Sequence, residues 1–338
     1  MVGAPDEFML GRVYVYTRTA RRWPATPSVT LVDPNPTLGD TFGYSVALFG
    51  DTLIVGDFQF NHTEGIAYVY VRSSAGWPTE PTLTVTDPRG TAGDGYGVSV
   101  AVTSDTALIS AYAPDQPLPG QAYLYARTSR RWSATPTMTF TNPGPIRNLY
   151  GLAVALAPGV AVVGACGCGG PAYPGFAYIY SRGAGGWNSE PGATLLDPGG
   201  RVGDFFGGTV GATRGSVVVG AAGAFPRGAA YVFERSTVGW PSSPTQVILD
   251  PGQSPEHGFG GREVISGHRA LITASQRAYV FTERGRSWNP RPRFVAIAPG
   301  RFLDGFGRAV SIAGRFLVVS APGASNSEGQ VYIFDTRS

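Results

Sequence analysis

The sequence contains no lysine, three histidines and two cysteines among its 338 residues. All 26 basic residues other than histidine are therefore arginines, which excludes Schiff-base chemistry at a lysine and the lysine of a phosphate-binding P-loop. The arginines are spread along the chain instead of forming one stripe, so we expect no nucleic-acid partner. No run of about 18 apolar residues occurs, and the sequence predicts no membrane span. Met1 leads directly into repeat sequence, and no signal peptide is visible.

The scarce cysteines and histidines also argue against catalytic and metal chemistry. Cys166 and Cys168 lie in the run GACGCGG, where one intervening residue is too short for ordinary disulfide geometry. We therefore expect two small residues in a glycine-rich loop. His62, His257 and His268 do not combine with a serine at a recognisable catalytic spacing, and no G-x-S-x-G motif exists. These absences predict that the chain is not an enzyme and uses no cofactor.

Glycine and proline, by contrast, are abundant, with 48 and 28 copies, while charged residues make up only 14%. They separate short apolar runs that are rich in β-branched and aromatic residues and show no helical period. Many short strands joined by many turns are therefore expected, which predicts an all-β protein.

Two landmarks recur together along the chain and define a repeat of about fifty residues. An aromatic residue followed by glycine occurs at Phe42, Tyr96, Tyr150, Phe206, Phe259 and Phe306. A tryptophan followed four residues later by proline occurs at Trp23, Trp77, Trp132, Trp187, Trp240 and Trp288. Each repeat holds four strand-like runs, which is typical of one blade of a β-propeller.

The repeat units predict a single β-propeller domain over residues 1–338. Their approximate bounds are 1–38, 39–92, 93–146, 147–202, 203–255, 256–302 and 303–338. The run that predicts the third strand of a blade occurs seven times, whereas the first and fourth strands occur six times each. Seven four-stranded antiparallel blades with incomplete first and last units are therefore predicted, and a ring of six blades is the alternative.

The order of these motifs resembles the FG-GAP repeat, which builds the head of integrin α-subunits and many secreted propellers. The resemblance rests on GDTFGYSVALFGDTLIVG (Gly39 to Gly56), VGAP (Val2 to Pro5) and VSAP (Val319 to Pro322). It implies seven blades and a role in adhesion or glycan binding. It also implies ligands on the face formed by the second-to-third and fourth-to-first strand loops. An extracellular or cell-surface location follows from the same resemblance.

Calcium-binding members of that family carry a D-x-D-x-D-G loop between the first and second strands. Here the corresponding connections are short, as in FGDT, TSDT, APGV, TRGS and SGHR, and none offers three closely spaced acids. We therefore expect no metal. The aspartates that recur before the aromatic-glycine pair (Asp40, Asp94, Asp204 and Asp304) are predicted to accept hydrogen bonds from turn amides.

Loops that break the repeat are the better candidates for a binding site, because the scaffold does not require their residues. Three such loops follow the second strands of consecutive units, at Asp57–Gly65, Ala111–Gly120 and Ala165–Gly175. They are predicted to form one patch whose ligand-binding residues are Phe58, Phe60, His62, Tyr112, Asp115 and Tyr173. Asn61 begins an N-H-T glycosylation sequon, usable only in a eukaryotic secretory route.

The sequence thus predicts a non-enzymatic interaction or adhesion module that binds a protein or a glycan through its loop face. Two alternatives remain open at this point. The chain could be a building block of a larger filament or surface assembly, with self-assembly through the incomplete end units. It could also be a multivalent lectin with one sugar site in each blade.

Overall fold

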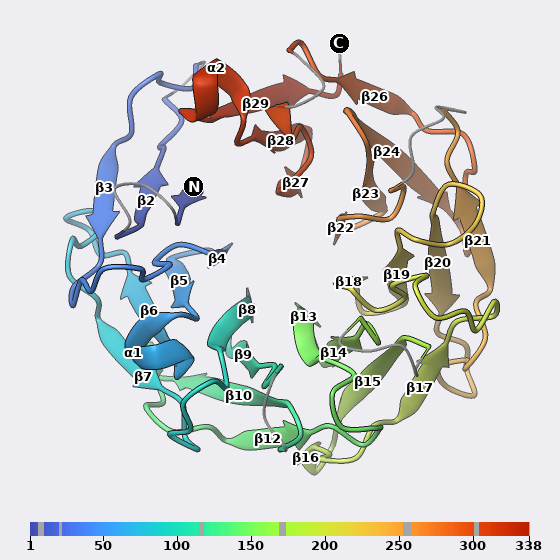
Figure 1. The fold of residues 1–338 in the computed structure, drawn as a ribbon, viewed down its shortest axis with the longest axis horizontal. Helices are drawn as coiled ribbons and strands as arrows, with labels where there is room; N and C mark the ends of the chain where they lie inside the picture. Colours follow the sequence, from blue (N-terminus) through green and yellow to red (C-terminus); the bar gives the residue numbers. More distant parts are fainter. Residues whose placement is uncertain are drawn as a thin grey trace. The chain divides into compact units, whose positions relative to one another are not determined.

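The computed structural model describes residues 1–5, 10–19, 22–114, 118–168, 174–252, 258–300 and 304–337. Over these residues the regular structure consists of seven antiparallel β-sheets and two single-turn helices, α1 (Phe60–Thr63) and α2 (Ala324–Ser327) (Figure 1). The all-β, seven-bladed propeller is confirmed, and the six-bladed alternative is wrong. Neither of these helices is long and apolar enough to cross a membrane.

The first three sheets contain strands β1 to β12. The first has the order β1-β2-β3, the second β4-β5-β6-β7, and the third β8-β9-β10 flanked by β11 and β12. Their bounds are β1 (Val2–Ala4), β2 (Arg12–Val15), β3 (Val29–Val32), β4 (Ser45–Phe49), β5 (Thr52–Asp57), β6 (Ile66–Val71), β7 (Leu83–Thr86), β8 (Tyr96–Val102), β9 (Thr106–Ala111), β10 (Gln121–Thr128), β11 (Arg131–Trp132) and β12 (Met138–Thr141).

The remaining four sheets contain strands β13 to β29. The sheets β13–β17 and β22–β26 have five strands, the sheet β18–β21 has four, and the last has the order β27-β28-β29. Their bounds are β13 (Tyr150–Ala157), β14 (Val160–Ala165), β15 (Phe176–Gly183), β16 (Gly186–Trp187), β17 (Ala193–Leu196), β18 (Thr209–Ala212), β19 (Ser216–Ala221), β20 (Ala229–Glu234), β21 (Gln246–Leu249), β22 (Glu263–Ser266), β23 (Arg269–Ala274), β24 (Arg277–Arg284), β25 (Ser287–Trp288), β26 (Phe294–Ile297), β27 (Val310–Ala313), β28 (Phe316–Ala321) and β29 (Gln330–Asp335).

The chain forms two compact units, Met1–Leu156 and Ala157–Ser338. In both units the second strands of several blades are buried along their whole length. The strands β5 (TLIVGD), β9 (TALISA), β14 (VAVVGA) and β19 (SVVVGA) are buried at every residue. Burial on both faces explains why these segments read as continuous apolar or small residues with no alternation.

The aromatic-glycine landmark fixes the packing between neighbouring sheets of the first unit. Phe42 is fully buried and its ring lies 5.6 Å from that of Tyr68. Gly43 has a φ of +91°, and a β-carbon there would lie 2.8 Å from the Arg12 carbonyl oxygen. Only glycine fits this left-handed and crowded position without strain, so the landmark is required by the backbone and by the core together.

An ion pair joins the second and third sheets of the same unit. Arg127 donates from both terminal nitrogens to Asp51, at 2.7 and 2.9 Å. This guanidinium lowers the pKa of Asp51 to about 2. Next to the ion pair, the Trp132 indole nitrogen donates to the Thr52 hydroxyl at 3.3 Å. The recurring tryptophan therefore packs and bonds within the scaffold at this position.

Candidate ligand-binding site

The loop that follows β5 carries three of the predicted site residues on an unusual backbone. Phe60 and His62 lie in α1, and Phe58 directly follows the strand. Asn61, His62 and Thr63 have φ values of 47°, 59° and 64°. Three consecutive non-glycine residues in the left-handed region are rare in scaffolds and concentrate at functional positions.

Phe58 and Tyr112, predicted from separate loops, are brought together with Tyr44, which the sequence analysis missed. The Phe58 ring lies 4.5 Å from the ring of Tyr44 and 6.3 Å from that of Tyr112. Phe58 and Tyr112 are half-buried, and Tyr44 is 48% exposed. We call these three residues the aromatic loop face.

Gly95 makes the aromatic loop face possible, because a β-carbon there would lie 2.9 Å or less from two Tyr112 ring carbons.

Tyr44 could have been found from the repeat itself. Its position, two residues after the aromatic landmark, is Val98, Leu152, Gly208, Gly261 and Arg308 in the other units. An aromatic residue occurs there once, at the place where the variable loops meet.

The other predicted residues lie in different surroundings. Phe60 packs against the buried core of the first two sheets and is half-buried. His62 and Asn61 are exposed, and the Asn61 amide donates to the carboxylate of Glu64. Asp115 and Tyr173 lie outside the described residues. Of the predicted patch, the structure therefore describes Phe58, Phe60, His62 and Tyr112.

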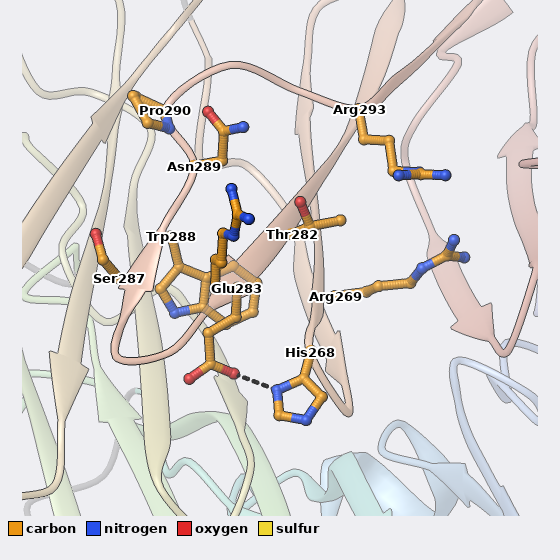
Figure 2. Close-up of a pocket in the computed structure, with 10 residues that line it drawn as sticks. His268, Arg269, Thr282, Glu283, Ser287, Trp288, Asn289, Pro290 and Arg293 are labelled. Carbon is orange, nitrogen blue, oxygen red and sulfur yellow. Dashed lines mark hydrogen bonds and ion pairs between the residues drawn. The ribbon is translucent and has the colours of Figure 1, made fainter.

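A groove of about 800 Å³ lies in the second unit (Figure 2). Its residues lie at and beside the β22–β23 and β24–β25 turns, at the opposite end of the blade from the β23–β24 turn. His268 and Glu283 face each other across part of the groove, and the His268 Nδ1 lies 2.8 Å from a Glu283 carboxylate oxygen. The other lining residues are Arg269, Thr282, Arg284, Ser287, Trp288, Asn289, Pro290 and Arg293.

One residue of the groove, Trp288, belongs to the recurring tryptophan landmark, whereas His268 and Glu283 stand where other units carry Asp51 and Arg72. Trp288 is 1% exposed, and its indole nitrogen donates to Glu234 at 2.9 Å. Arginines also stack on the equivalent tryptophans of other units, as in Arg72 over Trp77 at 5.7 Å. The tryptophan wall of the groove therefore follows from the blade architecture, whereas the His268–Glu283 pair is particular to this blade.

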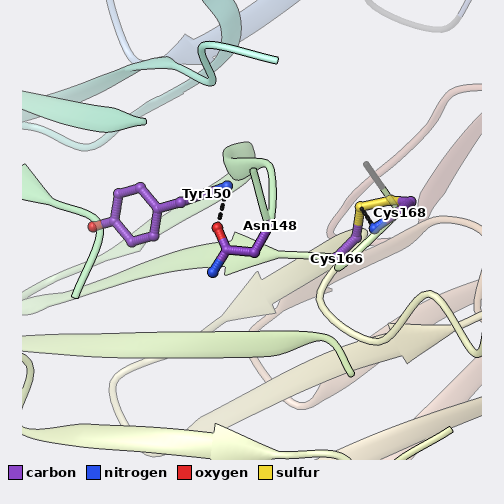
Figure 3. The surroundings of a disulfide bond; sticks show 4 residues. All are labelled: Asn148, Tyr150, Cys166 and Cys168. Carbon is purple, nitrogen blue, oxygen red and sulfur yellow. Dashed lines mark hydrogen bonds between the residues drawn. A yellow bond between two sulfur atoms is a disulfide. The ribbon is translucent and has the colours of Figure 1, made fainter. Parts of the chain in front are cut away.

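The structure corrects the expectation that the two cysteines of the third variable loop are not bonded to each other. A disulfide joins Cys166 and Cys168, whose α-carbons lie 5.2 Å apart (Figure 3). Gly167 between them has a φ of +64°, a left-handed turn that brings two α-carbons so close in sequence into bonding range. The expectation of two unconnected small residues overlooked the freedom of that intervening glycine.

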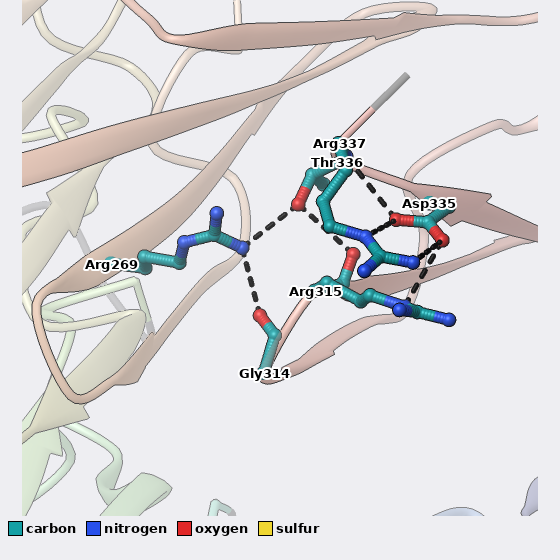
Figure 4. Close-up of polar contacts among 6 residues, drawn as sticks. All are labelled: Arg269, Gly314, Arg315, Asp335, Thr336 and Arg337. Atoms are coloured by element: carbon teal, nitrogen blue, oxygen red, sulfur yellow. Dashed lines mark hydrogen bonds and ion pairs between the residues drawn. The ribbon is translucent and has the colours of Figure 1, made fainter.

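Arg269, on the wall of the groove, is engaged in contacts between the last two sheets of its unit (Figure 4). Its guanidinium donates to the Gly314 carbonyl oxygen and to the Thr336 hydroxyl, both at 2.8 Å. The same hydroxyl donates to the Arg315 carbonyl oxygen at 2.9 Å. This arginine therefore stabilises the scaffold instead of being held ready for a ligand.

A second departure from the repeat is buried in the first strand of the sixth sheet. Glu263 is 6% exposed, and neither of its carboxylate oxygens accepts a hydrogen bond within the part of the chain that the structure describes. Burial raises the pKa of Glu263 to about 8, against smaller opposing effects of Thr209 and Arg262. The equivalent residues, four after the aromatic landmark, are Val46, Val100, Val154, Val210 and Val310.

Comparison with known proteins agrees with this architecture. The FG-GAP repeat family model matches residues 27–70, 77–125 and 296–334. The chain is a β-propeller that contains FG-GAP repeats in these three segments. No curated protein matches the sequence. Among solved structures, this FG-GAP propeller is similar to a periplasmic gluconolactonase of Pseudomonas aeruginosa. That match has 14% identity and a TM-score of 0.58, and it covers 96% of this chain and 91% of the other.

The same comparison overturns the sequence-based conclusion that the chain is not an enzyme. The fold that argued for a binding module is also the fold of an enzyme, the gluconolactonase. The error has a physical cause. Propellers place functional side chains on loops from separate blades, so a search for contiguous catalytic motifs does not detect them.

Proposed function

We propose that this FG-GAP propeller binds a carbohydrate through the aromatic loop face. The observation that carries the proposal is the contact of three partly exposed rings, Tyr44, Phe58 and Tyr112, contributed by three separate segments. Aromatic faces stack on the C–H faces of sugar rings, and a site needs only a few polar groups beside them to fix orientation.

Polar side chains next to the rings suit hydroxyl recognition. Gln59 and His62 are exposed, and Glu64 is half-buried, all on the loop that presents Phe58. Between them they offer amide, imidazole and carboxylate groups that donate and accept hydrogen bonds. The solved neighbour is named as a gluconolactonase, so sugar lactones belong among the ligands to be tested.

Affinity measurements on matched variants test the proposal. A glycan-array screen that also includes gluconolactone supplies the ligand, and calorimetry measures its Kd. We expect Phe58→Ala and Tyr112→Ala each to weaken binding by at least about tenfold, equivalent to about 1.4 kcal/mol. Phe225→Ala is the matched control, because Phe225 is 81% exposed in the corresponding loop of another blade.

Unchanged affinity in both loop-face variants would reject the proposed site. A protein ligand whose binding depends on the same two rings, with no sugar bound, would reject the carbohydrate class while retaining the face. Incubation of wild-type protein with gluconolactone in a pH-stat shows in addition whether a bound lactone is hydrolysed.

We further propose that the protein works outside the cytosol, at the cell surface or in an exported location. The disulfide between Cys166 and Cys168 supports this location, because such bonds persist in oxidising compartments. Thiol labelling of the native protein in cells, with and without reductant, tests it. Labelling of both cysteines without reductant would contradict it.

A further inference from the structure

Three aspartates lie buried together where the first sheet meets the second. Asp33 follows β3, Asp40 lies in the connection to β4, and Asp57 ends β5. They are 5%, 4% and 0% exposed. One carboxylate oxygen from each lies within 4.8 Å of those of the other two. Burying three carboxylates side by side is costly unless an opposite charge compensates them.

Two of these carboxylates each hold one oxygen without a partner. Asp57 Oδ1 accepts hydrogen bonds from the Thr41 backbone nitrogen at 2.8 Å and the Thr41 hydroxyl at 3.1 Å. Asp33 Oδ1 accepts from the Tyr68 hydroxyl at 3.0 Å and the Asn35 backbone nitrogen at 2.9 Å. The Oδ2 atoms of Asp33 and Asp57 are buried, and neither has a hydrogen-bond partner in the described structure.

Within the described ranges no cationic side chain compensates this cluster. None of the three aspartates there forms an ion pair with an arginine or a histidine, and no cation is among the groups that shift the pKa of Asp40 or Asp57. The charged groups that bear on Asp57 are Asp40 and Asp33, and both add to the effect of burial, which raises the pKa of Asp57 to about 7. The fully buried Asp57 Oδ2 thus lies among acidic groups and presents a free lone pair to them.

Equivalent positions in the same unit show which side chains the propeller places beside these acids. Asp87 and Asp94 correspond to Asp33 and Asp40. There Arg89 lies between them in sequence, with its Nε 3.3 Å from an Asp94 carboxylate oxygen. At the next position both acids are replaced by Asn142 and Asn148, whose amides are hydrogen-bonded at 3.0 Å.

The second unit follows the same rule. Asp197 and Asp204 are its corresponding pair, and Arg201 in the connecting loop opposes the rise of the Asp204 pKa. In the loop of the cluster, Asn35 and Thr37 occupy the positions of Arg89 and Arg201. The cluster therefore lacks the arginine that the other acidic pairs possess.

Asp57 is the residue that makes the cluster exceptional. It ends the second strand of its blade and pairs in register with Ile66. The residues at the same register position in the other six units are Ala4, Ala111, Ala165, Ala221, Ala274 and Ala321. The scaffold therefore accepts alanine here, and the third carboxylate is an addition that the fold does not need.

We propose that Asp33, Asp40 and Asp57 form a calcium-binding site. Hard cations prefer carboxylate oxygens, and Ca²⁺ takes oxygen ligands at about 2.3–2.6 Å. Two ligands on opposite sides of one such ion lie about 4.8 Å apart, and three carboxylate oxygens that lie within 4.8 Å of one another can therefore contact a single ion. Water completes coordination in many such sites.

This site differs from the calcium loops of the family, which join the first and second strands of a blade. The cluster uses the connection from a fourth strand to the next first strand, together with the end of a second strand. The ion would hold the Asp33–Tyr44 connection against the loop that presents Phe58. It would therefore rigidify the base of the aromatic loop face without contacting a ligand there.

Calcium titration of EDTA-stripped full-length protein tests the site, with CaCl₂ alone as the probe. We expect one ion per chain by calorimetry and a rise in Tm of about 5 °C at a hundredfold excess over the Kd. Asp57→Ala installs the residue of the other six units. It should lower calcium affinity by at least about tenfold while leaving the Tm in EDTA no lower than that of the wild type.

Two further variants make the result specific. Asn35→Arg places a guanidinium where Arg89 lies in the neighbouring unit, and it should abolish calcium binding while raising the Tm in EDTA. Asp204→Ala, at the position of Asp40 in another pair, should leave calcium affinity unchanged. The proposal is overturned if calcium gives neither heat nor a Tm shift in the wild type, or if Asp57→Ala binds calcium as tightly as the wild type.

Discussion

Replacing Glu263 by valine is expected to stabilise the protein by about 3 kcal/mol at pH 8, and by less than about 1 kcal/mol at pH 5. The reason is the pKa of Glu263, which burial raises to about 8 in the folded protein. An unfolded glutamate titrates near 4.3. Valine is the residue that the five equivalent positions carry, so the scaffold is suited to it.

The sign of the pH dependence follows from proton binding. Between about pH 4.3 and pH 8 the folded state holds a proton on Glu263 that the unfolded state has released. The stability associated with this group is therefore fully present below about pH 4.3 and is lost as the pH rises through about 8. Each unit of pKa shift corresponds to about 1.4 kcal/mol, and relaxation around the charged group reduces the total.

Urea denaturation of both proteins from pH 5 to pH 8.5 measures this difference. Glu190→Val is the control, since Glu190 is exposed, and we expect it to change stability by no more than about 0.5 kcal/mol at either pH. Parallel pH profiles for the wild type and Glu263→Val would show that the buried carboxylate is not the source of the dependence.

Truncating the aromatic landmark of the first unit gives the second large effect. Phe42→Ala is expected to lower the free energy of unfolding by about 3–5 kcal/mol. The ring is fully buried, and no other side chain fills the cavity that its removal leaves. It packs on Tyr68 within a cluster that spans the first two sheets, including Val13 and Leu31.

Tyr44→Ala, two residues further along the same segment, is the matched control. Tyr44 is 48% exposed and belongs to the aromatic loop face instead of the core. Its removal should cost less than about 1 kcal/mol in urea denaturation while weakening ligand binding. Equal losses of stability for the two variants would contradict the division between scaffold and binding residues.

The repeat made the fold predictable from the sequence. Two structural requirements explain the aromatic-glycine landmark. The core position requires the buried ring of Phe42, and the φ of +91° requires glycine at position 43. Both requirements recur at all six copies of the landmark, so the pattern is kept although the sequence varies elsewhere. The seven third strands favoured seven blades over the alternative of six, and the seven sheets confirm that number.

The proposed site was only partly predictable, because its residues come together from separate segments. Phe58 and Tyr112 were found as departures from the repeat, but Tyr44 was overlooked inside a segment assigned to the scaffold. The carboxylate cluster was missed for the same reason. The expectation of no metal considered only contiguous acidic loops, whereas Asp33 and Asp57 belong to different sheets.

These cases share a physical rule. In a repeat protein the scaffold sets the residue at each position, so a side chain that all other units lack is free to serve another purpose. Asp57 among alanines and Glu263 among valines are two such residues, and both are buried carboxylates with unpartnered oxygens. Comparing the residues at equivalent positions of the units in this chain thus identifies such side chains.

Hydrogen–deuterium exchange with and without the ligand found by screening tests the central claim most directly, because it reports which face the ligand covers. The aromatic loop face predicts protection in peptides that contain Tyr44, Phe58 and Tyr112, with no change in residues 268–293. Protection confined to residues 268–293, which line the groove of the second unit, would contradict the account and assign binding to the opposite end of the blades.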